Sequence, residues 1–186
     1  SLFKKSSASF YVVRPTHFTT QLQSWDCTFK ATAGGSFVVG QLWGALGTDY
    51  YLLDEIRARL SFTETCRAIR RMSAKWPRSY TKLIEAKANG DAIVDHLKRE
   101  LNGLTLLNPE GGKITRANAI EPLWEDSRIH LPCVELVPWI DDWLDEITGF
   151  PNKMNDDRVD AMSQALIYLE SKSIEKLRRA MANVGM

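Results

Sequence analysis

Carboxylates are the residues of this chain whose types and spacing could do chemistry. Asp26 lies within an alternating run, where aspartate is disfavoured in a strand and is costly to bury unpaired. Glu85 closes a short apolar run, and Asp157 and Asp160 stand three residues apart in a later amphipathic segment. Three such positions are what two hard divalent cations about 4 Å apart require for activating a water and attacking phosphorus.

Each of these acids also has an ordinary explanation. Asp26 could be a strand-edge carboxylate that faces water or pairs with a Lys or Arg, and Glu85 could be a solvated strand end. The acids at 155–161 could act as helix caps and first-turn acids, because a helix N-terminus favours both. Only the combination of the three positions favours metal chemistry.

The helix start at 155–161 leaves the third acidic position open. At about 100° per residue, Asp157 and Asp160 lie within about 60° of one another, opposite the apolar stripe that begins at Val159. Asp156 is the expected N-cap residue. Which of Asp156, Asp157 and Asp160 touch metal is not decided by the pattern.

A basic helical face is the candidate DNA-binding surface. It lies on the side of its segment away from the apolar residues and consists of Arg67, Arg70, Arg71 and Lys75. A solvated basic face is the alternative explanation. Because the formal net charge is only +1, DNA affinity must depend on local patches rather than on an overall basic excess.

Other groups of polar residues give weaker indications of a functional site. The acidic cluster Asp141, Asp142, Asp145 and Glu146 is expected to be a solvated helix face, because large apolar residues fill the other side. The segment 109–114 lacks the first Gly and the Ser/Thr of a phosphate loop. Three cysteines and three histidines lack ligand spacing, so we expect no zinc site and a reduced cytoplasmic protein.

The elements that must position the acids begin with three strands. Apolar runs at 21–30, 36–45 and 50–57, separated by glycine-containing turns, predict an antiparallel meander. The first run alternates, which predicts a half-buried strand with Asp26 on its polar face. Ser61 and Glu64 have capping-box spacing, and they predict a helix that ends at Pro77.

A parallel part is predicted next. Strands at 82–86 and 105–108 flank a helix, which is a β-α-β pattern with Glu85 at the carboxyl end of its strand. Beyond them we expect a helix at 116–121, strand pieces near Trp124 and Ile129, and helices at 136–147 and 158–169. The predicted class is α/β, with a mixed sheet of five or more strands and helices on both faces.

The 186 residues suit one domain with short appendages. We expect a linker or edge segment at 1–20, the domain at 21–170 and a helical tail at 171–186. No run is long and apolar enough for a membrane span, so no membrane association is expected.

Three segments together resemble the nuclease domain of tailed-phage large terminases. They are Ser24-Trp25-Asp26, 83–90 and 155–166, and the resemblance covers roughly residues 22–169. This family shares the RNase H-like fold with RuvC resolvases. The resemblance implies a metal-dependent endonuclease that cleaves double-stranded phage DNA during genome packaging.

The resemblance also implies site residues and partners. Asp26 would bind both metal ions, Glu85 one of them, and Asp157 and Asp160 would supply the third position, with two Mg²⁺ or Mn²⁺ ions per site. Asn155 stands where many relatives carry His. The expected partners are double-stranded DNA, the ATPase domain of a full-length chain, portal and the small terminase subunit, in the host cytoplasm. The chain contains no Walker motif, and as an isolated domain it is expected to be a monomer.

Two other functions fit the same residues. A RuvC-like junction resolvase would use the same chemistry on branched DNA. A non-catalytic RNase H-like module would serve only to dock on DNA or portal.

Overall fold

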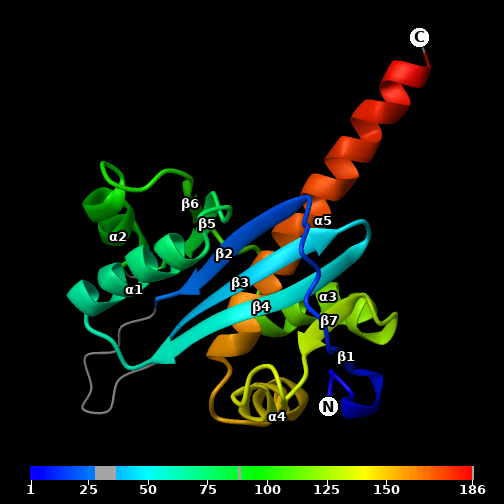
Figure 1. Ribbon diagram of the computed structural model, residues 1–186, viewed down its shortest axis with the longest axis horizontal. Helices are drawn as coiled ribbons and strands as arrows, with labels where there is room; N and C mark the ends of the chain where they lie inside the picture. The colour runs from blue at the N-terminus through cyan, green and yellow to red at the C-terminus, as the bar shows by residue number, and fades with distance from the viewer. Residues whose placement is uncertain (28–36, 88, 186) are drawn as a thin grey trace.

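A mixed sheet forms the centre of the computed structural model, which describes residues 1–27, 37–87 and 89–185 (Figure 1). Within those residues the sheet has seven strands in the order β1-β7-β4-β3-β2-β5-β6. The strands are β1 Ser9–Tyr11, β2 Thr20–Asp26, β3 Val38–Leu46, β4 Asp49–Ala58, β5 Thr81–Glu85, β6 Leu104–Leu107 and β7 Ile129–Pro132.

The predicted meander is confirmed by β2, β3 and β4, which pair antiparallel. Gly47 supplies a left-handed residue, with φ of +61°, in the tight turn between β3 and β4. The parallel part is confirmed as well, because β5 pairs parallel with β2 and β6 pairs parallel with β5. Positions 28–30 and 36 of the predicted strands lie outside the described residues.

Helices cover both faces of the sheet (Figure 1). They are α1 Phe62–Lys75, α2 Gly90–Leu97, α3 Lys113–Glu125, α4 Ile140–Gly149 and α5 Asp157–Val184, with a 3-10 turn at Lys5–Ser7. The buried apolar residues form two separate clusters, one for each face of the sheet. One cluster joins the sheet to α1 and α2, and the other joins it to α3, α4 and α5. The predicted fold class is therefore confirmed.

Helix α1 begins as the sequence predicts. Ser61 Oγ accepts a hydrogen bond from the Glu64 amide at 3.2 Å, and Glu64 Oε2 accepts one from the Ser61 amide at 3.3 Å. This reciprocal capping box satisfies two amides that the first helical turn leaves without partners. The helix ends at Lys75, before Pro77.

Other elements differ from the expectation. Trp124 belongs to α3 rather than to a strand, whereas Ile129 does begin β7. Helix α4 starts at Ile140, later than the expected 136. The last two expected helices are one continuous helix, α5, because no Gly or Pro interrupts 157–184. The proposed domain limits at 20 and 170 stay predictions.

Strand β2 is buried on both faces, so the prediction of a half-buried strand is wrong. Trp25 packs in the cluster under α1 and α2. On the opposite face, Ser24 Oγ donates to the Ala161 carbonyl of α5 at 2.7 Å and accepts from Gln164 Nε2 at 3.0 Å. The polar face of the strand is therefore covered by a helix, and α5 is fixed against it.

Among the described residues, no helix combines the length and the apolar character that crossing a bilayer requires.

Candidate metal centre

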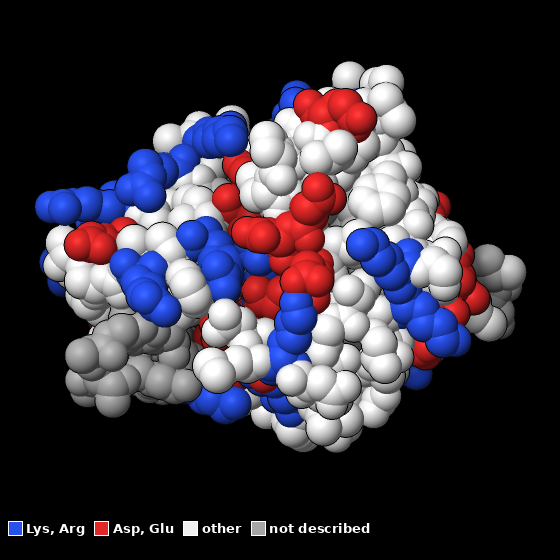
Figure 2. Space-filling view, turned by 90° about the horizontal axis from the view of Figure 1, so that it is seen from below, with Lys and Arg blue, Asp and Glu red and all other residues white. Residues whose placement is uncertain are grey.

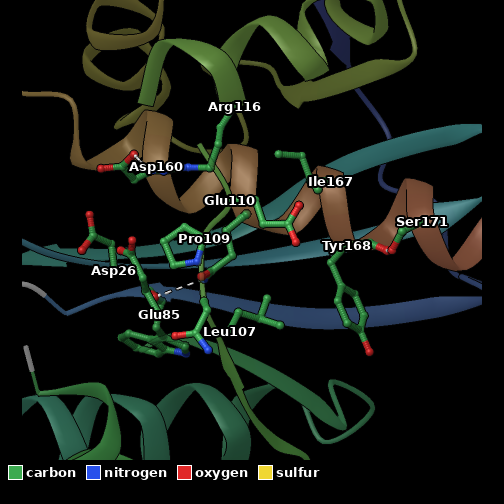
Figure 3. A pocket seen from close by; sticks show the side chains of 13 residues that line it. Asp26, Glu85, Leu107, Pro109, Glu110, Arg116, Asp160, Ile167, Tyr168 and Ser171 are labelled. Atoms are coloured by element: carbon green, nitrogen blue, oxygen red, sulfur yellow. Dashed lines mark hydrogen bonds and ion pairs between the residues drawn. The ribbon is translucent and has the colours of Figure 1, made fainter. Parts of the chain in front are cut away.

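A pocket of about 240 Å³ brings together acids from three elements (Figure 3). Asp26 from β2, Glu85 from β5 and Asp160 from α5 lie at one end of it. The remaining lining residues are Trp25, Leu107, Asn108, Pro109, Glu110, Arg116, Gln164, Ile167, Tyr168 and Ser171. The structure thus assembles one residue from each of the three predicted acidic positions.

The strand ends place Asp26 and Glu85. Each is the last residue of its strand, and the register pairs Trp25 with Ile84, one residue earlier on both strands. Carboxyl ends of neighbouring parallel strands meet at the same sheet edge, where open α/β sheets hold ligands. Both side chains are buried.

The Glu85 carboxylate retains binding capacity. Its Oε1 is buried and makes no hydrogen bond among the described residues, although Lys87 Nζ lies 3.2 Å away as an ion pair. A buried carboxylate oxygen normally has a hydrogen-bond partner, so this atom is suited to an additional cation.

Asp160 is held by two cations of α3. Arg116 Nη2 donates to Asp160 Oδ1 at 2.9 Å, and Lys113 Nζ lies 2.6 Å from Asp160 Oδ2. Burial raises the pKa of Asp160, while the hydrogen bonds and charges of Lys113 and Arg116 act in the opposite direction. Both oxygens of this carboxylate are therefore occupied by protein cations.

The two acids that precede Asp160 in the segment have other surroundings. Asp156 is at the N-cap position of α5 but makes no capping hydrogen bond, and its Oδ1 lies 2.6 Å from Lys113 Nζ instead. Asp156 therefore is the N-cap residue, as expected, but its side chain does not cap the helix. Asp157 does not line the pocket. Burial first, and the Glu146 carboxylate second, raise the pKa of Asp157 from 3.8 to about 6.

The acidic cluster of α4 is only partly the solvated face that was expected. Glu146 is buried, and its carboxylate accepts from the Arg158 amide at 3.0 Å and from Arg158 Nη1 at 3.2 Å. Arg158 Nε also donates to Glu55 Oε1 at 2.8 Å. A buried charge is tolerated when it is paired in this way, so these residues form a structural network.

The predicted basic face lies on α1, on the side of the sheet opposite α3 and α5 (Figure 1). Arg70 makes two hydrogen bonds to Glu100, at 2.8 and 2.9 Å, and Lys75 Nζ lies 2.8 Å from Asp54. Arg67 and Arg71 are exposed. None of these four residues lines the acidic pocket.

Positive charge on the face seen in Figure 2 is divided. Basic side chains form separate groups on either side of a central acidic group. This division agrees with the small net charge of +1 and leaves no continuous basic surface on that face.

Sequence reasoning missed the cations of α3. Lys113 and Arg116 approach Asp160 from more than forty positions away in the chain, and the segment that carries them suggests only an incomplete phosphate loop. The available signal was two cations three residues apart, just after Gly111-Gly112, which places both on one face of a first helical turn.

The donor set fits a hard divalent cation. Carboxylate oxygens are the ligands that Mg²⁺ and Mn²⁺ prefer, and Glu85 Oε1 has capacity for one. In the described part of the chain, no three His, Cys, Asp or Glu side chains are yet arranged around a common metal position.

Comparisons with known proteins identify the family and the fold. The family described as "Terminase RNaseH-like domain" matches residues 23–169. The structure is similar to that of a large terminase from a thermophilic bacteriophage, with a TM-score of 0.65 and 12% identity over 87% of this chain. That match covers 43% of the phage terminase, so this chain spans less than half of its length.

Similar structures include nuclease domains solved with metals. The large terminase nuclease of thermophilic phage G20c with bound zinc has a TM-score of 0.64 and 13% identity, covering 87% of this chain and 95% of that one. The same nuclease with bound magnesium has a TM-score of 0.63 and 14% identity, covering 88% and 94%. A search of curated protein sequences found no match. Because the family match covers most of the sequence, this chain belongs to the terminase RNase H-like domain family.

Proposed function

We propose that this chain is a metal-dependent endonuclease domain that cleaves double-stranded DNA during phage genome packaging. The observation that carries the proposal is the meeting of Asp26, Glu85 and Asp160 in one pocket, from two strand ends and a helix. Family membership and the metal-bound nuclease of phage G20c support it.

In this proposal Asp26, Glu85 and Asp160 hold two Mg²⁺ or Mn²⁺ ions. Such ions supply Lewis-acid activation of a water and stabilisation of the leaving oxygen. The protein fixes the carboxylates, since Asp26 and Glu85 end buried strands and Asp160 is on a helix fixed by Ser24. Asp157 does not line the pocket, and we assign it no ligand position.

The reaction needs no covalent intermediate. The nucleophile is water, because the residues that line the pocket include no cysteine, and its hydroxyl side chains, Tyr168 and Ser171, lie at the far end, away from the acids (Figure 3). In a full-length terminase the domain would act beside an ATPase domain, with portal and the small terminase subunit, in the host cytoplasm.

Plasmid nicking with added Mg²⁺ or Mn²⁺ tests the proposal. Asp26→Asn and Glu85→Gln should each abolish nicking while the fold, followed by circular dichroism, is retained. Asp95→Asn is the matched control, because Asp95 is an exposed acid of α2 outside the pocket. Undiminished cutting in excess EDTA would contradict the proposal.

Cleavage of different DNA substrates distinguishes the proposed nuclease from a junction resolvase and from a docking module. Linear duplex and four-way junctions should be cut at comparable rates, whereas a resolvase would strongly prefer the junction. A docking module would bind DNA and cut neither.

A further inference from the structure

Two cations from one turn of α3 meet a single carboxylate of the proposed metal centre. Arg116 binds Asp160 Oδ1 at 2.9 Å and Lys113 binds Asp160 Oδ2 at 2.6 Å. A carboxylate oxygen can accept a hydrogen bond and bind a metal ion together, but two protein cations against one carboxylate repel a metal ion that approaches it. Binding of a metal ion is therefore favoured if one of the two cations moves away.

The surroundings of Arg116 hold it in place. Its side chain is only 8% exposed, and Nη1 donates to the Gly111 carbonyl at 2.9 Å while Nη2 donates to Asp160. The guanidinium is planar, stays charged at any ordinary pH and has both donors already directed. Moving it would take the buried guanidinium away from both of its hydrogen-bond partners, Asp160 and the Gly111 carbonyl.

Lys113 is placed differently. Its side chain is 31% exposed, and its ammonium is shared between Asp160 Oδ2 and Asp156 Oδ1, each at 2.6 Å. Asp156 is itself 33% exposed. A flexible lysine can therefore leave Asp160 and remain paired with Asp156 at the edge of the pocket, with little loss of interaction.

We propose that Lys113 occupies the place of a divalent cation at Asp160 until metal binds, whereas Arg116 is a fixed positioning residue that orients Asp160 for that metal. The inference rests on the proposed metal centre. Metal binding then displaces the Lys113 ammonium to Asp156, so the chain has its own counter-ion for the acids when metal is absent.

Replacing Lys113 or Arg116 by Gln removes one positive charge in either case, but the two roles predict opposite effects on the affinity for Mn²⁺. Lys113→Gln removes a competitor, so the affinity for Mn²⁺ should rise, by about fivefold. Arg116→Gln removes the group that orients a ligand, so the affinity should fall by about tenfold, as is usual for partners of metal ligands. Pure charge repulsion would instead make both substitutions raise the affinity.

Calorimetric titration of the whole chain with Mn²⁺ measures this directly. Lys98→Gln is the matched control, because Lys98 forms an exposed ion pair with Asp95 on α2 and does not touch the pocket. It should leave the affinity unchanged. If Arg116→Gln does not fold, Arg116→Lys retains the charge without the two-pronged geometry, and it should still weaken Mn²⁺ binding.

Displacement of Lys113 has a readout independent of cleavage. Acetylation by a small amine-reactive reagent, followed by mass spectrometry, should increase at Lys113 on addition of Mn²⁺ and stay constant at Lys98. An affinity that rises for both the Lys113 and the Arg116 variants, or an unchanged reactivity of Lys113, would overturn the proposal.

The failure of this inference is distinguishable from the failure of the proposed function. Wild-type chain that binds Mn²⁺, loses it in Asp26→Asn and shows no change in Lys113→Gln retains the metal centre and refutes the exchange. Wild-type chain that binds no Mn²⁺ refutes both.

Discussion

Replacing Asp157 by Asn should stabilise the metal-free protein at neutral pH. The pKa of Asp157 rises from 3.8 to about 6, first because of burial and second because of Glu146. A raised carboxyl pKa means that the folded state disfavours the charged form, so the ionised aspartate destabilises the fold above that pKa.

The size of the effect follows from the shift. About two pKa units correspond to about 3 kcal/mol between the protonation states. Asn also loses the favourable interaction of a first-turn acid with the helix dipole, worth up to about 1 kcal/mol. Solvent screens this partly exposed side chain, so the net gain should be about 1 kcal/mol, or a Tm higher by about 2–4 °C for a domain of this size.

The pH dependence supplies the sharper test. Between the unfolded pKa of 3.8 and the folded pKa of about 6, the folded state binds more protons, so wild-type stability falls as pH rises through this window. Asp157→Asn lacks this titration. The difference in the free energy of unfolding between Asp157→Asn and wild type should reach its maximum at pH 8 and should nearly vanish near pH 4.

Urea unfolding in EDTA at both pH values measures this difference. Asp141→Asn is the control, because Asp141 is also a first-turn acid but is exposed. It should lose slight stability at both pH values. The reasoning would be refuted if the difference in the free energy of unfolding between Asp157→Asn and wild type were equal at pH 4 and pH 8. A less stable variant at pH 8 would refute it as well.

Three further predictions concern other parts of the molecule. Arg158→Met should lower the free energy of unfolding by about 3–5 kcal/mol in urea titrations, because it leaves the buried Glu55 without its cation and Glu146 with only Arg57, 3.6 Å away; a loss below about 1 kcal/mol would show that the network is dispensable. Gly90→Ala would place a Cβ 2.1 Å from the Glu85 carbonyl, so it should move that strand end and reduce nicking more than 10-fold while Tm falls; wild-type nicking would mean that Glu85 need not be fixed. Replacing Arg67 and Arg71 by Glu should slow nicking most at low salt; nicking curves that match wild type at every salt concentration would identify these arginines as a solvated face.

Local patterns predicted much of the sheet and part of the site. Alternation and glycine turns are properties of neighbouring residues, so the meander followed from them, as did the capping box at Ser61. Glu85 was expected at the carboxyl end of its strand and is there, whereas Asp26 was expected within a strand over 21–30 and is instead the last residue of β2. Parallel pairing of β2 and β5 brings the two ends to a common edge.

Long-range pairings could not be predicted in this way. The helical period placed Glu146 on a polar face, but only the folded chain brings Arg158 and Arg57 against it, which makes that face a buried network. Likewise, nothing in the segment around Asp160 indicates that Lys113 and Arg116 of another helix hold its two oxygens.

Helix α5 is one continuous helix that connects the acidic pocket with a projecting C-terminal end (Figure 1). Its second half extends from the body, while its first turn carries Asp160, and no Gly or Pro separates the two (Figure 1). At 1.5 Å per residue, its free end lies roughly 36 Å from Asp160. The helix is buried against the domain as far as Leu169, so a bend of about 5° there would move Val184 by about 2 Å and leave Asp160 in place. Motion at the far end is therefore reduced before it reaches the acids, so a load applied there need not disturb the alignment of the carboxylates.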